Sequence, residues 1–244
     1  MILAGKNKYN DSKRLFLLLI IEKNSTFLFV FRSDGVKYVP PKNIGRCNLM
    51  KYCNFIAQTV LPTKEGKLIV RAYKHVDFPS PNLEPLVLFY QQPSNNCVLR
   101  VHDACYTSEV LGSMRCDCKE QLDTSLQYIK EHGGAIIYLQ QEGRGIGLSN
   151  KIKAYALQDG GLDTVEANLR IGHEVDERTY EVLPDILEDM NIQEIHLMTN
   201  NPRKMMCIQD AGVQVTERIP IVIPSNSTNR DYLQTKKDKM RHIL

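Results

Sequence analysis

Short apolar segments that read as β-strands alternate with helical segments from about residue 58 onward. Leu122, Leu126 and Ile129 show the helical spacing of i, i+4 and i+7, and Gly133 and Gly134 end that helix. A chain with this alternation folds into layers of helices on a sheet. We therefore predict an α/β domain built on a mixed sheet with flanking helices. Strands are expected at 67–73, 85–90, 97–102, 135–139 and 195–198, helices at 122–132, 151–158, 180–190 and 202–211, and closing core segments at 213–215 and 219–223.

Residues 1–57 follow a different pattern and contain no chemical motif. Segments 26–31 and 36–39 flank Ser33-Asp34-Gly35, which predicts a β-hairpin with an Asp-Gly turn. We interpret residues 1–57 as an N-terminal extension of unknown role and residues 58–244 as a single domain. The apolar run at 15–21 is too short to span a bilayer and predicts a strand. Charged residues follow it where a signal peptide has small ones, so we expect a cytoplasmic protein.

The charge balance excludes some partners. The chain has 31 basic and 28 acidic residues, a formal net charge of +3. Nucleic-acid-binding proteins usually concentrate basic residues on one face, and this chain shows no such concentration. We expect no nucleic-acid partner and no membrane association.

Three of the seven cysteines, Cys105, Cys116 and Cys118, lie within fourteen residues. In a chain of this length such clustering indicates a metal site or reactive thiols rather than a disulfide framework. Three protein ligands are typical of a catalytic zinc, which keeps a fourth position for water, whereas structural zinc takes four. His102 offers a fourth ligand for a closed site, and three buried thiols in a reducing cytosol are the alternative without metal. The four other cysteines are interpreted as ordinary core or surface residues: Cys47, Cys53, Cys97 and Cys207.

Two strand-to-helix turns have features of anion sites. Residues 141–147 form a Gly-rich turn that matches neither a Walker A loop nor a dinucleotide fingerprint. Within it, Glu142 suits the N–H edge of a guanine-like base and Arg144 suits phosphate. In residues 199–204 a proline opens a helix whose first turn carries two cations, which suggests an external anion. A plain Asn cap with solvent-facing Arg and Lys is the alternative, and Asp176 alone reads as a helix cap.

Taken together, these segments resemble GTP cyclohydrolase II, the zinc enzyme that begins riboflavin synthesis. The likeness covers residues 58–244 and leaves out residues 1–57. Its motifs, in chain order, are RVHDAC at 100–105, GSMRCDC at 112–118, QEGRGIGL at 141–148, NKIKAYALQD at 150–159, DTVEAN at 163–168, DER at 176–178, LMTNNPRK at 197–204 and YLQTK at 232–236.

The resemblance implies a reaction and a site. A zinc ion held by Cys105, Cys116 and Cys118 activates water for attack on the guanine imidazole ring of GTP, and formate and diphosphate leave. Catalytic roles fall to Asp176 as proton acceptor, Arg178 as nucleophile on the α-phosphorus, and Tyr155 near the base. Because arginine stays protonated, we expect Arg178 to bind and polarise the phosphate instead. The implied substrate-binding residues are Arg100, Val101, His102, Asp103, Ala104, Gln121, Glu142, Gly143, Arg144, Thr164, Thr199 and Lys204.

The same resemblance implies Mg²⁺ on the substrate triphosphate and a homodimer. The sequence also departs from the family. Asp103-Ala104 stand where Ser-Glu is usual, and Lys119 stands where a glycine is usual. Successive strand residues face opposite ways, so Asp103 is expected to point away from the position of the missing glutamate. Two alternatives follow: a related cyclohydrolase with altered nucleotide specificity or a partial reaction, and a catalytically inactive zinc-binding homologue.

Overall fold

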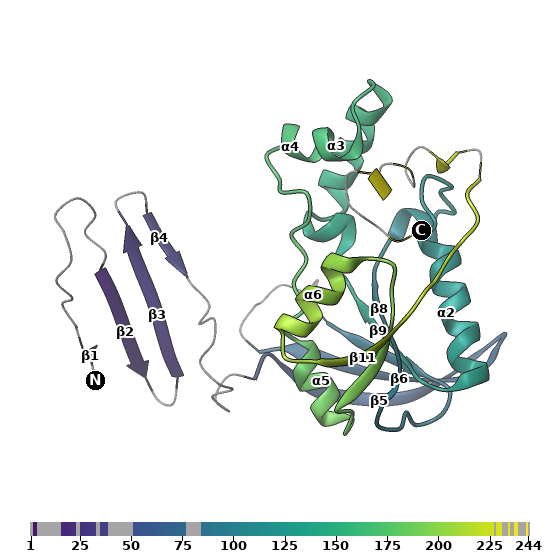
Figure 1. Ribbon diagram of the computed structural model, residues 1–244, viewed down its shortest axis with the longest axis horizontal. Coiled ribbons are helices and arrows are strands. Elements are labelled where there is room, and N and C mark those ends of the chain that lie inside the picture. The colour runs from purple at the N-terminus through teal and green to yellow at the C-terminus, as the bar shows by residue number, and fades with distance from the viewer. Residues whose placement is uncertain are drawn as a thin grey trace. The chain divides into compact units, whose positions relative to one another are not determined.

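The computed structural model describes the strands of the N-terminal segment, residues 51–76, 84–226 and 228–230, and the further residues 234, 237, 238 and 243. The chain divides into two units, Met1–Lys51 and Tyr52–Leu244. The first contains a four-stranded antiparallel sheet in the order β1-β2-β3-β4 (Figure 1). Its strands are β1 (Ile2–Leu3), β2 (Phe16–Glu22), β3 (Ser25–Arg32) and β4 (Gly35–Tyr38).

Two expectations for the N-terminal segment are confirmed. Residues 16–21 of the apolar run lie in strand β2, and β3 pairs with β4 as an antiparallel hairpin. Ser33 and Asp34 of the expected turn lie outside the described residues. Among the helices that the structure describes, none has the length and apolar character needed to cross a bilayer.

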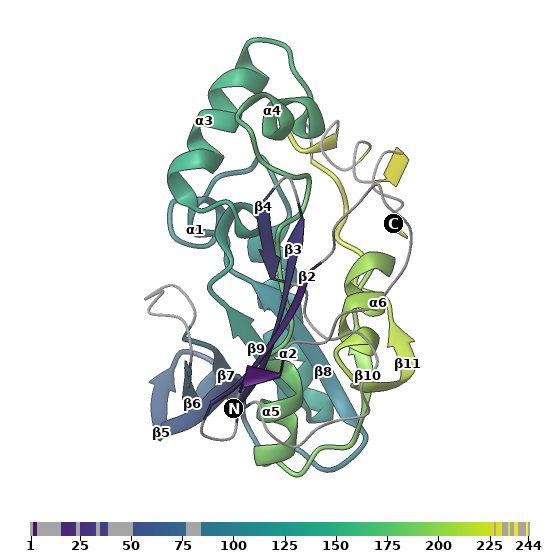
Figure 2. The ribbon, with the colours of Figure 1, turned by 90° about the vertical axis from the view of Figure 1, so that its left-hand side faces the viewer.

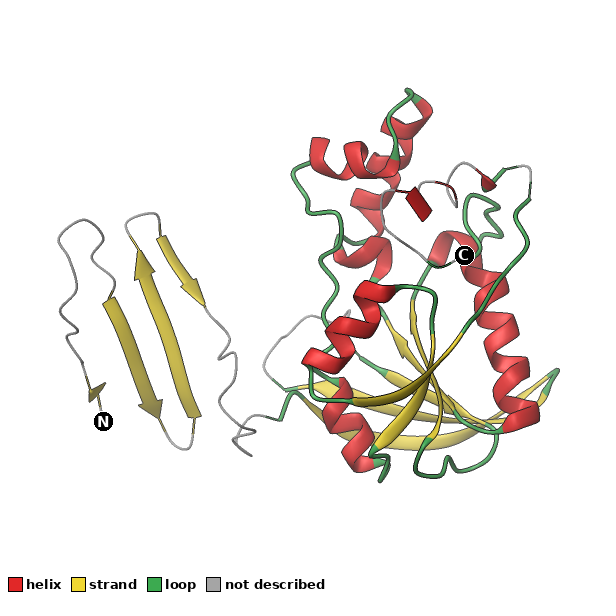
Figure 3. Ribbon diagram, in the orientation of Figure 1, coloured by secondary structure: helices red, strands yellow, loops and turns green. Residues whose placement is uncertain are grey.

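The second unit is built on a seven-stranded mixed sheet in the order β11-β10-β8-β9-β7-β6-β5 (Figure 3). The first four strands of this order run parallel, and the remaining pairings are antiparallel. This arrangement confirms the predicted α/β fold class. Strand β5 includes residues 53–57, which the sequence pattern assigned to the extension. The strands are β5 (Cys53–Thr63), β6 (Gly66–His75), β7 (Leu86–Phe89), β8 (Cys97–Asp103), β9 (Ala135–Leu139), β10 (Glu194–Met198) and β11 (Gln214–Ile219).

Helices cover both faces of this sheet, with α2 on one side of the central strands and α6 on the other (Figures 1 and 3). Figure 2 shows α3 and α4 together at the end of the unit toward which β9 points. The described helices are α1 (Tyr106–Glu109), α2 (Cys118–His132), the 3₁₀ turn η1 (Glu142–Gly145), α3 (Leu148–Asp159), α4 (Thr164–Arg170), α5 (Leu183–Asp189) and α6 (Pro202–Asp210).

Alternation along the strands decides which side chains enter the core. In β8, Leu99 and Val101 are fully buried in a cluster that includes Leu183 of α5 and Ile208 of α6. The intervening side chain of Arg100 points to the other face, where it contacts Gln121 of α2. The face of β8 that carries Leu99 and Val101 therefore forms the main core, and the face that carries Arg100 leads toward the site.

Two predictions about residues 176–190 need correction. Asp176 does not cap a helix, because residues 176–180 are not helical and α5 begins at Leu183. The helix predicted at 180–190 is shorter than expected: α5 covers Leu183–Asp189, and Pro184 lies in its first turn, where its missing N–H costs no hydrogen bond. Tyr180, the first residue of the predicted helix, is buried but precedes α5.

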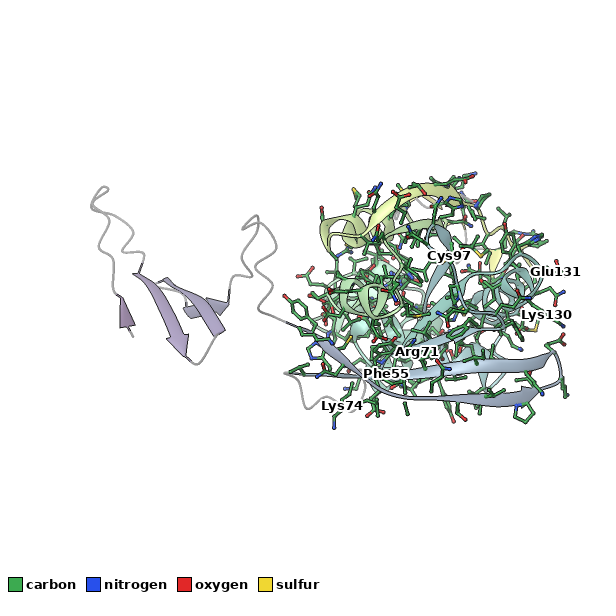
Figure 4. All side chains as sticks on the ribbon, turned by 90° about the horizontal axis from the view of Figure 1, so that it is seen from below. Phe55, Arg71, Lys74, Cys97, Lys130 and Glu131 are labelled. Carbon is green, nitrogen blue, oxygen red and sulfur yellow. The ribbon has the colours of Figure 1, made fainter. Side chains whose placement is uncertain are left out.

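The antiparallel end of the sheet is held by polar contacts. Arg71 of β6 lies over the Phe55 ring of β5, 4.5 Å from its centroid (Figure 4). The same guanidinium donates to Asp189 of α5 at 2.7 Å, and the Tyr73 hydroxyl donates to that carboxylate at 2.7 Å. These contacts fix α5 against β6, on the part of the sheet that ends in β5.

Candidate active site

Three cysteine side chains converge where β8 ends and α2 begins. The Sγ atoms of Cys105, Cys116 and Cys118 lie within 4.8 Å of one another, and those of Cys105 and Cys116 are 3.6 Å apart. Tetrahedral zinc with Zn–S bonds of about 2.3 Å places its sulfurs roughly 3.8 Å apart. A disulfide would need about 2.05 Å. The spacing therefore fits three thiolate ligands of one zinc ion.

His102 does not join the three cysteines. Its Nε2 lies 2.9 Å from Glu109 Oε1, and its ring stacks on Tyr138 with centroids 5.6 Å apart. Glu109 also accepts from the Cys105 backbone N–H at 2.8 Å and from the Tyr138 hydroxyl at 2.6 Å. Among the described residues, the group placed to hold a metal consists of the three cysteines alone. The geometry thus favours the open three-ligand arrangement over the closed one with His102.

The Gly-rich turn carries a carboxylate to the cysteines. Gly143 and Arg144 of η1 adopt left-handed backbone angles, with φ of 62° and 64°. Glu142 accepts from the Tyr106 backbone N–H at 2.5 Å and from Lys151 Nζ at 2.7 Å. Lys151 Nζ also lies 3.0 Å from Cys105 Sγ. Hydrogen bonds from the Cys116 and Cys118 thiols, and then this ammonium, hold the pKa of Cys105 far below its ordinary value.

The opposite end of the site contains paired charges. Asp103 Oδ2 accepts from Lys204 Nζ and from Arg178 Nη1, both at 2.6 Å. Burial raises the pKa of Asp103, but these two cations outweigh it and lower that pKa to about 2. Burial lowers the pKa of Lys204 to about 8, although Asp103 acts in the other direction. We interpret the group as an anion subsite in which Asp103 is the shared partner of two cations.

Arg178 is held on all of its nitrogen atoms. Asp176 accepts from Nε at 2.8 Å and from Nη2 at 2.6 Å, which is a bidentate pair. Arg203 Nη2 donates to the Asp176 backbone carbonyl at 2.9 Å. Burial raises the pKa of Asp176, but the hydrogen bonds and charge of Arg178 hold it below its ordinary value. The proton therefore stays on the guanidinium.

Both interpretations of residues 199–204, an anion site and an Asn cap, apply in part to the start of α6. The Asn201 side chain accepts from the backbone N–H groups of Arg203 and Lys204, so the Asn cap is confirmed. The expected solvent-facing position holds only for Arg203, whose side chain is 51% exposed. Lys204 is buried and also donates to the Val101 carbonyl at 2.9 Å. A buried ammonium in the first turn of a helix is the stronger sign of an anion subsite.

These groups line one pocket. Asp103 and Ala104 both line it, although alternation predicted opposite directions, because β8 ends at Asp103 and the alternation ends with it. The lining residues are Arg100, His102, Asp103, Ala104, Cys105, Cys116, Cys118, Gln121, Gln141, Glu142, Gly143, Arg144, Lys151, Tyr155, Arg178, Thr199, Asn200, Asn201 and Lys204.

Three predicted site residues lie outside the lining. Val101 is fully buried and contributes its carbonyl to Lys204. Asp176 lies behind Arg178, and Thr164 begins α4. The lining residues that sequence reasoning gave no role are Gln141, Lys151, Asn200 and Asn201. For Gln141, Asn200 and Asn201, their place in the two anion-type turns was the available signal; for Lys151, it was its place in the motif at 150–159.

The fold and the pocket together define an α/β protein in which three thiols with the spacing of metal ligands lie in one pocket with buried, paired cations. Residues 54–220 match the family model of GTP cyclohydrolase II, and the chain belongs to that family. It is 47% identical to GTP cyclohydrolase-2 of Campylobacter fetus subsp. fetus over 190 residues, covering 75% of this chain and 92% of that protein. It is 56% identical to GTP cyclohydrolase-2 of Sulfurospirillum multivorans over 143 residues, covering 59% of this chain and all of that protein.

One of the longer relatives is named after riboflavin biosynthesis. The chain is 43% identical over 185 residues to the riboflavin biosynthesis protein RibBA of Cytophaga hutchinsonii, covering 75% of this chain and 45% of that protein. Among solved structures, a two-domain 3,4-dihydroxy-2-butanone 4-phosphate synthase from A. baumannii matches 72% of this chain and 41% of its own, with a TM-score of 0.37 and 13% identity. That likeness is too weak to inform the function.

Proposed function

We propose that this protein hydrolyses GTP to formate, diphosphate and 2,5-diamino-6-(5-phosphoribosylamino)pyrimidin-4(3H)-one, the first step of riboflavin biosynthesis. Water is consumed in opening the imidazole ring, in releasing formate and in cleaving the α–β phosphate bond. The observation that carries the proposal is the single pocket, with Cys105, Cys116 and Cys118 at one end and Arg178 and Lys204 at the other. One end suits a metal-activated water and the other suits a polyphosphate. Membership of the family and the names of its relatives support this choice.

The cysteines would hold zinc, which supplies a Lewis acid and an activated water for hydrolysis at guanine C8. Glu142 lies on the same side of the pocket and would accept a hydrogen bond from the guanine N–H edge through Oε2, which has a further lone pair beside its contact with the Tyr106 N–H. Tyr155 lines the pocket beside Lys151, whose Nζ lies 5.7 Å from the ring centroid, and Arg115 lies over the same ring, 4.8 Å from the centroid. This side chain would position the base.

At the other end, Arg178 and Lys204 would bind the phosphates. We propose an electrostatic role for Arg178 rather than a nucleophilic one, because its nitrogens donate to Asp176 and Asp103 and its proton stays in place. Asp176 then orients Arg178 instead of removing its proton. Mass spectrometry of enzyme quenched during turnover tests this: a guanylyl adduct on Arg178 would contradict the electrostatic role.

Mg²⁺ is proposed to enter with the triphosphate. It usually keeps several waters and binds through one or two carboxylates together with substrate phosphates. Asp103 Oδ1 is buried beside the anion subsite and has no hydrogen-bond partner among the described residues. That oxygen is available to Mg²⁺ or to one of its waters. A homodimer and a cytoplasmic location also remain proposals; light scattering tests the first.

The decisive experiment incubates the purified protein with zinc, magnesium and GTP and measures formate and diphosphate. We expect both products, loss of activity in Cys118→Ser, and activity close to wild type in Cys207→Ser, which removes a thiol outside the cluster. Release of neither product by metal-loaded protein would refute the proposal.

A second candidate is a related cyclohydrolase with another nucleotide preference or a partial reaction. Ala104 lines the pocket where the family usually has a glutamate, and Asp103 adds a carboxylate to the phosphate end. A panel of purine nucleotides with product masses separates the two, since preference for another nucleotide, or formate retained in the product, would favour this candidate. An inactive homologue is the third reading, and zinc found with four protein ligands would support it.

A further inference from the structure

Lys151 is a buried cation that the proposed reaction does not use. Its residue is 9% exposed, and its ammonium lies 3.0 Å from Cys105 Sγ and 2.7 Å from Glu142 Oε1. It is therefore the group that joins the cysteine cluster to the carboxylate of the Gly-rich turn. The three residues come from three different segments. Cys105 lies between β8 and α1, Glu142 begins η1, and Lys151 lies in α3.

Burial of the Lys151 ammonium costs free energy that its contacts must offset. It lies in the first turn and a half of α3, where the helix dipole disfavours a cation. Its stem also packs under the Gly-rich turn: a Cβ on Gly143 would lie 3.1 Å from Lys151 Cβ and 3.1 Å from Ile146 Cγ1. The side chain is thus fixed along its length, and its two anionic partners compensate for the burial of its charge.

We propose that Lys151 is a positioning residue. It fixes the side chains of Cys105 and Glu142 relative to each other, and its positive charge offsets the negative charge of the metal site. Three thiolates and a divalent ion leave one negative charge in excess, which a single ammonium balances. A thiolate that accepts a hydrogen bond also donates less charge to its metal, so the metal stays a stronger Lewis acid. The contact with Glu142 fixes the carboxylate that faces the base; this second part rests on the proposed function.

Cobalt substitution tests the metal part without substrate. Wild type, Lys151→Met, Lys151→Arg and Lys153→Met are loaded with Co²⁺, and the thiolate-to-cobalt charge-transfer band is recorded. Lys153 is exposed on the same helix and serves as the matched control. We expect Lys151→Met to move the band to lower energy, because the sulfur loses its hydrogen bond. Lys151→Arg should restore most of the shift, and Lys153→Met should leave the band in place.

Kinetics test the contact with Glu142. We expect the KM for GTP to rise about tenfold in Lys151→Met, with kcat reduced as well, because the carboxylate loses its charged hydrogen-bond donor. The rise in KM should not add to that of Glu142→Gln in the double variant, since both changes remove the same contact. Lys153→Met should match wild type.

The outcomes separate the inference from the function on which it partly rests. A wild-type protein that shows no thiolate-to-cobalt band would overturn both the metal site and the role of Lys151. A wild-type band with an unchanged band in folded Lys151→Met would overturn the inference alone, and additive KM effects would overturn its Glu142 part. Circular dichroism checks folding. If Lys151→Met does not fold, Lys151→Gln replaces it under the same criteria.

Discussion

Gly145 offers a direct test of how the Gly-rich turn supports the anion subsite. Its φ is +95°, and a Cβ at this position would lie 2.9 Å from the carbonyl carbon of Glu177 and 3.0 Å from its oxygen. Glu177 N–H donates to the Arg144 carbonyl at 2.9 Å. The turn therefore lies directly against the segment that carries Asp176 and Arg178. A methyl group at position 145 must push this segment away.

The magnitude follows from a matched pair of variants. Gly212 has a similar φ of +90°, and a Cβ there would have no atom within 4 Å. Gly212→Ala should lose only the cost of a left-handed backbone in a non-glycine residue, about 1–2 kcal/mol. Gly145→Ala should lose that amount and a further ~1–3 kcal/mol from overpacking. Urea unfolding of the two variants at a fixed zinc concentration measures the difference.

Activity provides the second measure. A Cβ contact of 2.9 Å must open by several tenths of an ångström, and a displacement of 1 Å near the reacting groups can reduce a rate about a hundredfold. We expect kcat/KM for GTP to fall about tenfold in Gly145→Ala and to stay unchanged in Gly212→Ala. Equal losses of stability in the two variants, with activity retained in both, would refute the proposed support of Arg178 by Gly145.

Three further predictions address the metal, the phosphate end and a helix cap. Cys118→Ser should abolish retention of zinc during dialysis against a weak chelator, whereas Cys207→Ser should retain one ion per chain by metal analysis. Because the pKa of Lys204 is about 8, its positive form is lost as pH rises through that value; kcat/KM should decline above about pH 8, and a profile that stays level there would contradict the role of Lys204. Asp163→Ala should lower the free energy of unfolding by about 1 kcal/mol in urea, because Asp163 caps α4 through the N–H groups of Val165 and Glu166, and no loss would contradict the capping box.

The sequence predicted most of the second unit because its elements have local signals. Strand β9 lies at residues 135–139 as expected, and α2 ends at His132 before the predicted glycines. Asp176 was misread because an aspartate before a chain of polar residues resembles a cap, while its real partner is a guanidinium two residues on. The sequence did not predict strand β5, because ten of its eleven residues are exposed and it lacks the alternation of buried and exposed residues that a half-buried strand shows.

In the site too, residues close together in the sequence could be predicted, and contacts between distant residues could not. The spacing of Cys105, Cys116 and Cys118 predicted their convergence, because few other arrangements explain three thiols so close in a chain. Lys151 was missed because its partner Cys105 is 46 positions away, and a lysine on an amphipathic helix ordinarily faces solvent. Pairings of this kind depend on the packing of α3 against η1, which no local pattern encodes.

The carboxylate of Asp103 also has a consequence for how the proposed substrate enters. This carboxylate pairs with both Lys204 and Arg178, and Asp176 supplies the second negative charge, so neither cation depends on counterions from solution. Binding of a triphosphate is then an exchange of one anion for another within a buried site. Few ions are released to the solvent, and buried pairs are screened only weakly. The affinity for GTP should therefore vary little with ionic strength, unlike that of an open basic surface.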